Sequence, residues 1–352
     1  MVEVAGYWAA LIDLTNPAAR EWTKGFLRSE LLGVGASGWM ADFGEAMPCE
    51  GVRLHDGVAP CAYHSAYAVE WARLNREAVD EAAAAGEVAA DETLIFSRSG
   101  FTRSPGVAQL FWLGDQLTSW DEHDGFGSAL QGALSGGMTG YGLTHSDVGG
   151  YTGAHLRLFG RSLARVVRDR EMLLRWAEQN AFSDAVLRTH EGLLPIDNHQ
   201  VWSDEVTLRH VRRCTLIFVA LRPYRRQLMD ESGRRGWPML RHPVLHFPRD
   251  PTLLADATGA GGGGRRIRQF MLGPDYMVVP VLRPGVEAVA AYLPAGRWVR
   301  LWAAAGATAE IEVTHGSWHD VDAPIGRPAF FARAEAPSLE GVTRALREAG
   351  VL

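Results

Sequence analysis

The stretch GWMADFGEAMP, residues 38–48, begins as an apolar strand and ends in two carboxylates, Asp42 and Glu45. Trp39 and Met40 are typical of a strand that packs in a protein interior. One interpretation of the two acids is a helix start, because Asp-x-x-Glu is close to a capping box. The other interpretation is a catalytic carboxylate, Asp42, at the carboxyl end of a strand. The rest of the chain decides between the two.

The first two thirds of the chain repeat one pattern: a short apolar strand, a polar residue at its end, and an amphipathic helix. We expect strands at 7–13, 36–42, 92–98, 109–115, 139–147 and 184–190, and helices at 17–32, 63–85, 121–135, 156–181 and 203–232. This alternation predicts a parallel sheet with right-handed crossovers. No Gly-x-Gly-x-x-Gly follows the first strand, which argues against a dinucleotide-binding fold. We therefore predict an α/β fold, a partial TIM (β/α)8 barrel.

Each of these strands ends in a charged or titratable residue, and turn formation alone does not explain all of them. In a barrel the carboxyl ends of the strands form one face, where catalytic residues gather. The residues expected on that face are Asp13, Asp42, Arg98, Asp115, Asp147 and His190. Since the pattern supplies fewer strands than the eight of a complete barrel, the chain is expected to lack the first two.

The pattern changes after residue 237. Short strands are expected at 276–282, 287–293, 297–302, 309–314 and 328–333, separated by turns rich in Pro and Gly, and the run 261–264 is expected to be a loop. This spacing predicts an antiparallel β-sandwich. The predicted domains are the carboxyl-terminal part of a catalytic barrel at 1–236, a β domain at 237–335, and a short, helical tail at 336–352.

Composition excludes several classes of function. The chain has 352 residues and a net charge of -6, which gives no support for nucleic-acid binding, and no apolar run is long enough to span a membrane. The amino terminus lacks the basic region of a signal peptide. The three cysteines, Cys49, Cys61 and Cys214, form neither a zinc motif nor a disulfide framework, although Cys49 and Cys61 could pair across a loop. A reducing cytoplasm is the expected location, and the twelve tryptophans favour a carbohydrate or aromatic ligand.

Two carboxylates on facing strand ends are the catalytic groups that glycoside hydrolysis requires. One attacks the anomeric carbon, while the other protonates the leaving oxygen. When the two lie about 5–5.5 Å apart, the reaction retains the anomeric configuration through a glycosyl ester. Arginine and histidine side chains at the same face can bind sugar hydroxyls.

Several long motifs, in order, make the chain resemble glycoside hydrolase family 31, and in particular its sulfoquinovosidases. They are GWMADFGEAMP, FSRSGFTRSPG, FWLGDQLTSWDEHDG, SGGMTGYGLTHSDVGGYT, LRTHEG, LLRWAEQNAF, RHPVLHFP and YLPAGRWVRLW. The resemblance implies that Asp42 is the nucleophile at the end of the fourth barrel strand, with Glu45 supporting it, and that Asp115 is the general acid/base after the sixth strand. It also implies that strands three to eight are present, and that the first two strands and a preceding β-sandwich are absent.

The resemblance further implies which residues bind the sugar. Arg98, Asp147 and His190 match positions that grip its hydroxyls, and Tyr151 matches one that helps to hold a sulfonate. The other sulfonate contacts of that group lie upstream of this sequence. The expected substrate is therefore an α-sulfoquinovoside, cleaved with retention and without a cofactor or a metal.

Each residue also has a structural interpretation. Asp115 and Asp147 could serve turns, Arg98 an ion pair, and His190 the core; Tyr151 could pack in its loop. Trp39 and Trp112 could be walls of the sugar subsite or simply strand packing. His145, Asp147 and His190 invite a metal interpretation, which the absence of a His-x-His motif and of the early strands disfavours.

Two alternatives to a sulfoquinovosidase remain open. One is an α-glucosidase or α-xylosidase of the same family. The other is an inactive fragment, or half of a split enzyme. The expected partners are a small glycoside and either a homo-oligomer or a complementing amino-terminal half, with no nucleic acid and no membrane.

Overall fold

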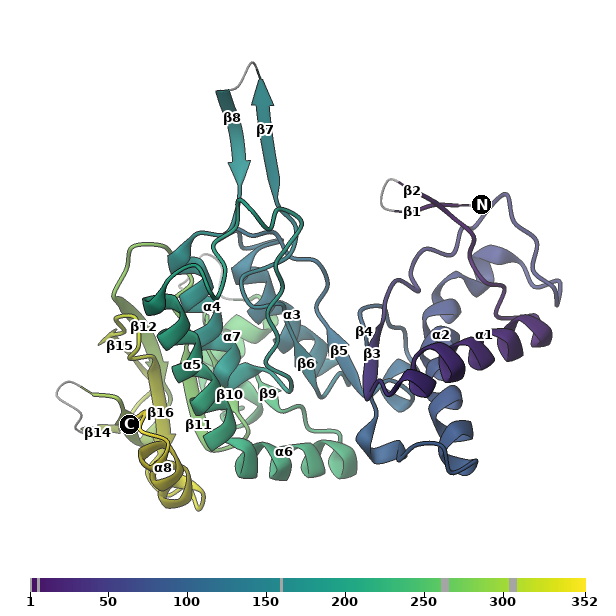
Figure 1. Ribbon diagram of the computed structural model, residues 1–352. Helices are drawn as coiled ribbons and strands as arrows, with labels where there is room; N and C mark the ends of the chain where they lie inside the picture. The colour runs from purple at the N-terminus through teal and green to yellow at the C-terminus, as the bar shows by residue number, and fades with distance from the viewer. Residues whose placement is uncertain (1, 5–6, 159–160, 261–265, 304–308) are drawn as a thin grey trace. The chain divides into compact units, whose positions relative to one another are not determined.

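The computed structural model describes residues 2–4, 7–158, 161–260, 266–303 and 309–352. The predicted loop at 261–264 lies outside these residues. The chain divides into two compact units, Met1–Trp112 and Leu113–Leu352. The positions of the chain's parts relative to one another are not determined (Figure 1), and each unit is described by itself.

The first unit holds a parallel sheet flanked by two long helices. Its strands β3, β4 and β5 are parallel neighbours, with Trp39 opposite Ile95 and Ser97 opposite Phe111. Their bounds are Gly38–Ala41, Leu94–Ser97 and Leu110–Trp112. The helices are α1 (Pro17–Glu30) and α2 (Pro60–Ala84), and single 3-10 turns lie at Leu32–Val34, Ala90–Glu92 and Ser104–Gly106. The predicted alternation of parallel strands and helices is confirmed here.

The helices of the first unit form where local signals and packing agree. Asn16 caps α1 by accepting a hydrogen bond from the Ala18 N–H at 3.0 Å, and Pro17 occupies the first turn. In α2, Ala78 and Val79 are fully buried, and Val79 packs with Ala41 and Ile95 of the sheet. This packing fixes the strand that precedes Asp42.

The predicted strand at 7–13 is wrong as a member of the parallel sheet. Strand β2 (Tyr7–Ala9) instead pairs antiparallel with β1 (Val2–Val4). Farther along, Leu14 is buried against α2, with Leu11 and Ile12 packed beside it. Asp13 accepts hydrogen bonds from the Thr15 and His55 N–H groups, so its carboxylate serves a turn. The apolar run fills a core without extending a strand.

The predicted helix at 156–181 is wrong in its first half. Residues there form a hairpin, β7 (Ala154–Leu158) and β8 (Arg161–Val166), which extends from the second unit in Figure 1. Polar and apolar residues alternate over 155–158, His-Leu-Arg-Leu, which is the period of a strand. Helix α4 (Arg170–Ser183) begins only where Asp169 accepts a hydrogen bond from the Met172 N–H at 2.8 Å.

Two other predictions for the second unit need correction. Residues 184–190 form no strand and make one parallel bridge, Val148 to Thr189. The predicted helix at 203–232 is two helices, α5 (Glu205–Ala220) and α6 (Arg222–Arg235), because Pro223 begins a new helix after Leu221. Helix α3 (Phe126–Met138) and the short strand β6 (Thr144–His145) agree with the predicted order.

The carboxyl-terminal part is antiparallel, as predicted. A six-stranded sheet runs in the order β14-β13-β16-β11-β10-β9, and a separate pair is β12-β15. Strands β9, β10 and β15 were not predicted. The bounds are β9 Leu240–Arg241, β10 Phe270–Leu272, β11 Tyr276–Val279, β12 Ala288–Leu293, β13 Gly296–Leu301, β14 Ala309–Val313, β15 Ser317–Asp322 and β16 Ala329–Arg333. Helices α7 (Pro251–Thr258) and α8 (Leu339–Glu348) and a 3-10 turn, Pro243–Leu245, complete the unit.

Both faces of the sheet are buried at β10, β11 and β16, which explains why these strands are apolar, whereas the edge strand β14 is mostly exposed. In β11, Tyr276 and Val278 join a core with Trp176 and Phe182 of α4, whereas Met277 and Val279 join a core with the β12-β15 pair. Successive side chains of a strand point to opposite faces. The sheet therefore packs on helices with one face and on the second sheet with the other.

Two further sequence predictions bear on the chain's surroundings. Cys49 and Cys61 form a disulfide, the pairing across a loop that the sequence left open, and Cys214 is a buried free thiol. Across the described ranges, we find no helix with the length and hydrophobicity needed to cross a bilayer.

Candidate active site

Asp42 lies directly after β3, in a loop with an unusual backbone. Phe43 has a φ of 58°, in the left-handed region, and its N–H donates to Asp42 Oδ1 at 2.7 Å. The Trp71 indole of α2 donates to the Asp42 carbonyl at 3.0 Å. No helix begins between residues 42 and 59, so the helix-capping interpretation of Asp42 and Glu45 is wrong.

Gly44 makes this loop possible. Its φ is +90°, and a Cβ at this position would lie 2.4 Å from Ser99 Oγ. A larger residue would therefore be strained and would also collide with the chain after β4. The close approach holds the Asp42 loop against the loop that begins at Arg98.

Arg98, at the end of β4, joins the two acids. Its Nε atom lies 3.2 Å from Asp42 Oδ1 and 2.9 Å from Glu45 Oε1, and its Nη2 atom lies 2.5 Å from Glu45 Oε1. The guanidinium carbon is 4.3 Å from the centre of the Phe43 ring. Three of the predicted site residues, Asp42, Glu45 and Arg98, thus form one cluster at the carboxyl edge of the parallel sheet.

The two tryptophans predicted for the site differ in their surroundings. The Trp39 indole donates to the buried amide of Asn75 at 2.7 Å, and its ring packs against α2. Trp112 is buried, and its ring centre lies 5.9 Å from the Arg98 guanidinium. The structural interpretation therefore fits Trp39 better than it fits Trp112.

The remaining predicted site residues lie in the second unit, on three neighbouring loops. Asp115 is half-buried and follows Gly114, whose φ is +86°. Its carbonyl accepts a hydrogen bond from the Thr152 hydroxyl at 2.9 Å, and the Gln116 carbonyl accepts one from the Tyr151 N–H at 2.8 Å. The backbone thereby ties the Asp115 loop to the Tyr151 loop.

Asp147 is fully buried and forms an ion pair with Arg188. Arg188 was not singled out from the sequence, although it stands two residues before His190 in LRTHEG. It could have been inferred from a physical rule, because a buried carboxylate such as that of Asp147 needs a nearby cation or several hydrogen-bond donors. The Tyr151 and His190 rings lie edge to face, with centroids 4.6 Å apart.

Two histidines of this unit, His190 and His145, have lowered pKa values, which favour their neutral rings. Burial lowers the pKa of His190, and the positive charges of Arg188 and Arg168 lower it further. His190 Nδ1 accepts a hydrogen bond from the Gly192 N–H at 3.0 Å, so in the neutral ring the proton is on Nε2. Burial also lowers the pKa of His145 to about 3. In the parts of the chain that the structure describes, no three His, Cys, Asp or Glu side chains are grouped as metal ligands.

The structure therefore gives two groups of predicted site residues, one in each unit. Asp42, Glu45 and Arg98 form the first, with Trp112 beside them. Asp115, Asp147, Tyr151 and His190 lie on the linked loops of the second.

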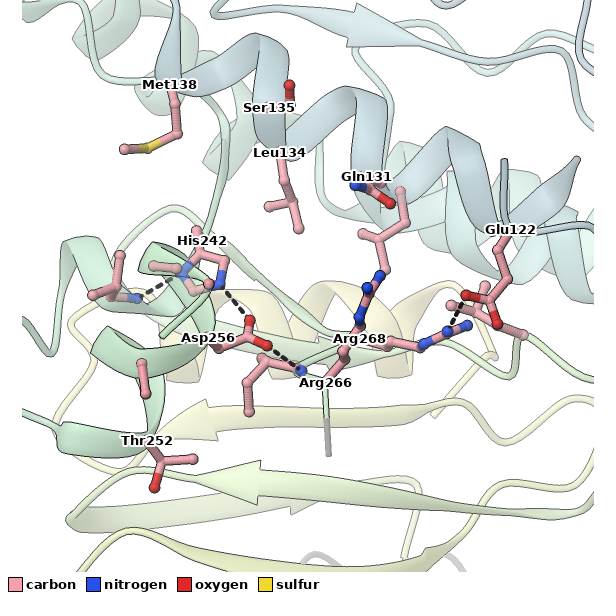
Figure 2. Close-up of a pocket in the computed structure, with 18 of the residues that line it drawn as sticks. Glu122, Gln131, Leu134, Ser135, Met138, His242, Thr252, Asp256, Arg266 and Arg268 are labelled. Atoms are coloured by element: carbon pink, nitrogen blue, oxygen red, sulfur yellow. Dashed lines mark hydrogen bonds and ion pairs between the residues drawn. The ribbon is translucent and has the colours of Figure 1, made fainter. Parts of the chain in front are cut away.

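A pocket of about 940 Å³ lies elsewhere in the second unit, between α3, α7 and the segment 266–268. Figure 2 shows Glu122 facing Arg268, and His242 facing Asp256, on its walls. None of the predicted site residues lines it.

Comparison with known proteins identifies the family. Residues 2–226 match the model of the glycosyl hydrolases family 31 TIM-barrel domain, and residues 236–336 match that of the glycosyl hydrolase family 31 C-terminal domain. The predicted resemblance and the combination of a TIM-barrel domain with an antiparallel domain are thereby confirmed.

Several similar proteins are sulfoquinovosidases. Those of Escherichia coli (strain K12) and Agrobacterium fabrum are each 36% identical over 96% of this chain, and the match covers 45% and 46% of their lengths. A solved family 31 sulfoquinovosidase from E. rectale, in complex with an aza-sugar inhibitor, superposes with a TM-score of 0.81 at 34% identity, covering 96% of this chain and 46% of that one.

The chain spans about half the length of the curated relatives it matches. Relatives named alpha-glucosidase or alpha-xylosidase are also similar, at identities of 32% or less. The family models together cover nearly the whole chain, and the Asp42–Glu45–Arg98 cluster lies within the matched barrel domain. The chain belongs to glycosyl hydrolase family 31.

Proposed function

We propose that this chain carries the catalytic groups of a retaining α-glycoside hydrolase that cleaves α-sulfoquinovosides. The observation that carries the proposal is the 36% identity to two sulfoquinovosidases over 96% of the chain. The cluster of Asp42, Glu45 and Arg98 supports it, because a carboxylate at the carboxyl end of a parallel strand, oriented by an arginine, suits a nucleophile.

In the proposed reaction, Asp42 attacks the anomeric carbon and forms a glycosyl ester, while the bond to the leaving oxygen breaks. Asp115 donates its proton to that oxygen. It then accepts a proton from the water that hydrolyses the ester, which restores both carboxyl groups. Two inversions at the anomeric carbon give net retention. Arg98 and Glu45 orient Asp42.

The loops of the second unit are proposed to bind the sugar. Asp147 accepts hydrogen bonds from hydroxyls, and His190 donates one from Nε2. Tyr151 donates its phenol proton to a sulfonate oxygen. We assign Trp112, beside Arg98, to the wall of the sugar subsite and Trp39 to packing against α2. No cofactor or metal takes part in the proposal.

We further propose that β3 is the fourth and β5 the sixth strand of the family's barrel. The proposed domains are 1–236, 237–335 and a tail at 336–352. The matched ranges 2–226 and 236–336 support this division, and α8 occupies most of the tail.

The proposal also includes a protein partner, either a second copy of this chain or a complementing polypeptide. Trp22 and Phe26 of α1 support a partner, because their rings stack at 6.0 Å and are 65% and 49% exposed. The preparation that turns over substrate, either the chain alone or the chain with that polypeptide, is called the active preparation below.

The Cys49–Cys61 disulfide argues against the proposed cytoplasmic location, because the cytoplasm is reducing and disulfides persist mainly in oxidising compartments. Counting free thiols in protein isolated under alkylating conditions decides between them. Three thiols support the cytoplasm, whereas a single one, Cys214, supports an oxidising compartment.

The function is tested by comparing hydrolysis of an aryl α-sulfoquinovoside with that of an aryl α-glucoside and an aryl α-xyloside. We expect the active preparation to prefer the sulfoquinovoside, and Asp42→Ala to abolish its turnover. Preference for the glucoside or the xyloside would replace the substrate in the proposal. Turnover that survives Asp42→Ala would overturn the mechanism. If neither the chain alone nor the chain with the complementing polypeptide hydrolyses any of the three substrates, an inactive fragment is favoured.

A further inference from the structure

Arg168 is a buried cation that the proposed reaction does not use. It lies between β8 and α4, and only 1% of its surface is exposed. Burial lowers the pKa of Arg168 to about 10, with the nearby charge of Asp147 acting in the opposite direction. The side chain therefore carries its charge at neutral pH. A buried cation is tolerated only when its N–H groups find acceptors, so their identity shows what the residue does.

The acceptors of Arg168 belong to two loops. Its Nη1 atom donates to the His190 carbonyl at 2.7 Å and, over longer distances of 3.4 and 3.5 Å, to the carbonyls of Val148 and Gly150. Its Nε atom donates to the His199 carbonyl at 2.8 Å. One loop runs between Asp147 and Tyr151, and the other begins at His190. A single guanidinium thus spans the loops that carry three predicted sugar contacts.

The fit between Arg168 and the first loop is close. Gly149 has a φ of +88°, and a Cβ there would lie 2.2 Å from Arg168 Cδ. The loop can therefore lie on the arginine stem only because this residue is glycine.

The buried amide of Gln200 extends the contacts of Arg168 along the second loop. Arg168 Nη2 donates to Gln200 Oε1 at 2.7 Å, and the Gln200 amide donates to the Glu191 carbonyl at 3.0 Å. The Leu193 N–H donates to the Tyr151 carbonyl at 3.0 Å, which joins the second loop back to the first. The edge-to-face contact of Tyr151 and His190 lies within this closed network.

We propose that Arg168 is a positioning residue that holds Tyr151 and His190 in the mutual arrangement needed to bind the sulfonated sugar. The inference rests on the proposed function for the roles of these two residues. It adds that their arrangement is set by one guanidinium whose planar fork reaches carbonyls on both loops. Lysine concentrates its donors on one atom and cannot reach both sides at once.

The test compares Arg168→Lys with Arg175→Lys. Arg175 is a matched control, because it is 2% exposed and binds Glu178 and the Val286 carbonyl, at 2.9 and 3.0 Å, away from both loops. Both variants keep the charge and lose the fork. A residue with a purely structural role would lower the melting temperature without affecting one pair of rings more than the rest of the fold.

The first measurement needs no substrate. In protein labelled on Tyr and His rings, the Tyr151 and His190 protons should give an NMR cross-peak, assigned by its loss in Tyr151→Phe and His190→Gln. We expect Arg168→Lys to abolish this cross-peak while the remaining aromatic spectrum stays native, and Arg175→Lys to retain it. A cross-peak that persists in folded Arg168→Lys protein overturns the inference.

The second measurement uses the active preparation. Because a displacement of about 1 Å in a binding group costs about a hundredfold in rate, we expect Arg168→Lys to lower kcat/KM for the aryl α-sulfoquinovoside by about a hundredfold, mainly through KM, and to lower kcat/KM for the aryl α-glucoside less. Arg175→Lys should leave the ratio of the two unchanged. An unchanged ratio in Arg168→Lys contradicts the inference.

The outcomes separate the inference from the proposed function. If wild-type protein hydrolyses no sulfoquinovoside, the proposed function fails, whereas the NMR result still decides whether Arg168 sets the ring pair. If Arg168→Lys does not fold, Gln200→Met takes its place, since it leaves the arginine but removes one of its acceptors, together with the hydrogen bonds that the Gln200 amide donates to the second loop. We expect it to weaken the cross-peak, and a cross-peak of native intensity overturns the inference.

Discussion

Arg98 and Asp42 are paired across two adjacent parallel strands, with Arg98 Nε 3.2 Å from Asp42 Oδ1. The same guanidinium binds Glu45 and lies over the Phe43 ring, so its position is fixed from three sides. An acid that must approach an anomeric carbon along one line benefits from such a fixed neighbour.

Replacing Arg98 should impair the proposed nucleophile without unfolding the protein. We expect Arg98→Met to lower kcat/KM of the active preparation by about a hundredfold, because Asp42 loses the group that orients it. Glu45→Gln should have a smaller effect, since Glu45 is 48% exposed and the glutamine side chain still offers Arg98 one acceptor oxygen. Arg76→Met, which removes an exposed ion pair with Asp80 in the same unit, is the control and should leave activity unchanged. Equal activities of Arg98→Met and Arg76→Met would refute the role given to Arg98.

Breaking the Asp147–Arg188 pair should destabilise the second unit. Asp147 is fully buried whereas Arg188 is 25% exposed, so Arg188→Met leaves a buried carboxylate without this cation. We expect the free energy of unfolding, measured in urea, to fall by about 3 kcal/mol, at the lower end for buried pairs. The double variant Asp147→Asn/Arg188→Met should lose less, because the uncompensated charge is gone. A double variant less stable than Arg188→Met would show that the charge is not the cause.

His145 should make the protein less stable in weak acid. Its pKa is about 3 in the folded chain and about 6.5 in the unfolded chain, so the unfolded state binds the extra proton between these values. Stability from the neutral ring is complete above pH 6.5 and is lost as the pH falls, by about 2 kcal/mol at pH 5. Comparing urea unfolding of wild type and His145→Asn at pH 7 and pH 5 isolates this contribution. The variant should lose about 2 kcal/mol less than wild type over this interval, and identical losses would exclude His145 as the cause.

Reduction of the Cys49–Cys61 disulfide should loosen the segment between Asp42 and α2. The bridge closes a loop with a sequence separation of 12, for which loop-closure entropy corresponds to about 3 kcal/mol. We expect Cys49→Ser/Cys61→Ser to unfold at lower urea concentration than wild type, and a thiol reductant to destabilise wild type but not the variant. If the reductant shifts both proteins equally, its effect does not come from this bridge.

The parts of the fold that the sequence predicted correctly are those in which local pattern and packing agree. The strand before Asp42 and helix α2 combine apolar periodicity with a shared core, and the antiparallel strands of the last domain lie between turns. The errors at 7–13 and 156–181 both arose where apolar residues suit more than one element. The first segment is decided by the distant packing of Leu14 against α2, and the second by the local Asp169 cap at which α4 begins.

For the site, too, residues with a local sequence pattern were predicted, and residues defined by distant contacts were missed. Asp42 and Arg98 were predicted because each ends a strand, and the structure brings them together. Arg188 and Arg168 were missed because an arginine that binds a distant carboxylate or distant backbone carbonyls leaves no local pattern in the sequence. Only the folded loops show that these two cations hold the residues that the motifs revealed.

The covalent intermediate gives the most direct test of the central claim. In Asp115→Ala, an aryl α-sulfoquinovoside with a good leaving group should still glycosylate the nucleophile, whereas hydrolysis of the ester lacks its base, so the ester should accumulate. The measurement is peptide mass spectrometry after an acid quench of the active preparation. The account predicts a sulfoquinovosyl adduct on the peptide that contains Asp42, absent in Asp42→Ala/Asp115→Ala. An adduct on another residue would contradict it, as would turnover by Asp115→Ala at the wild-type rate without an adduct.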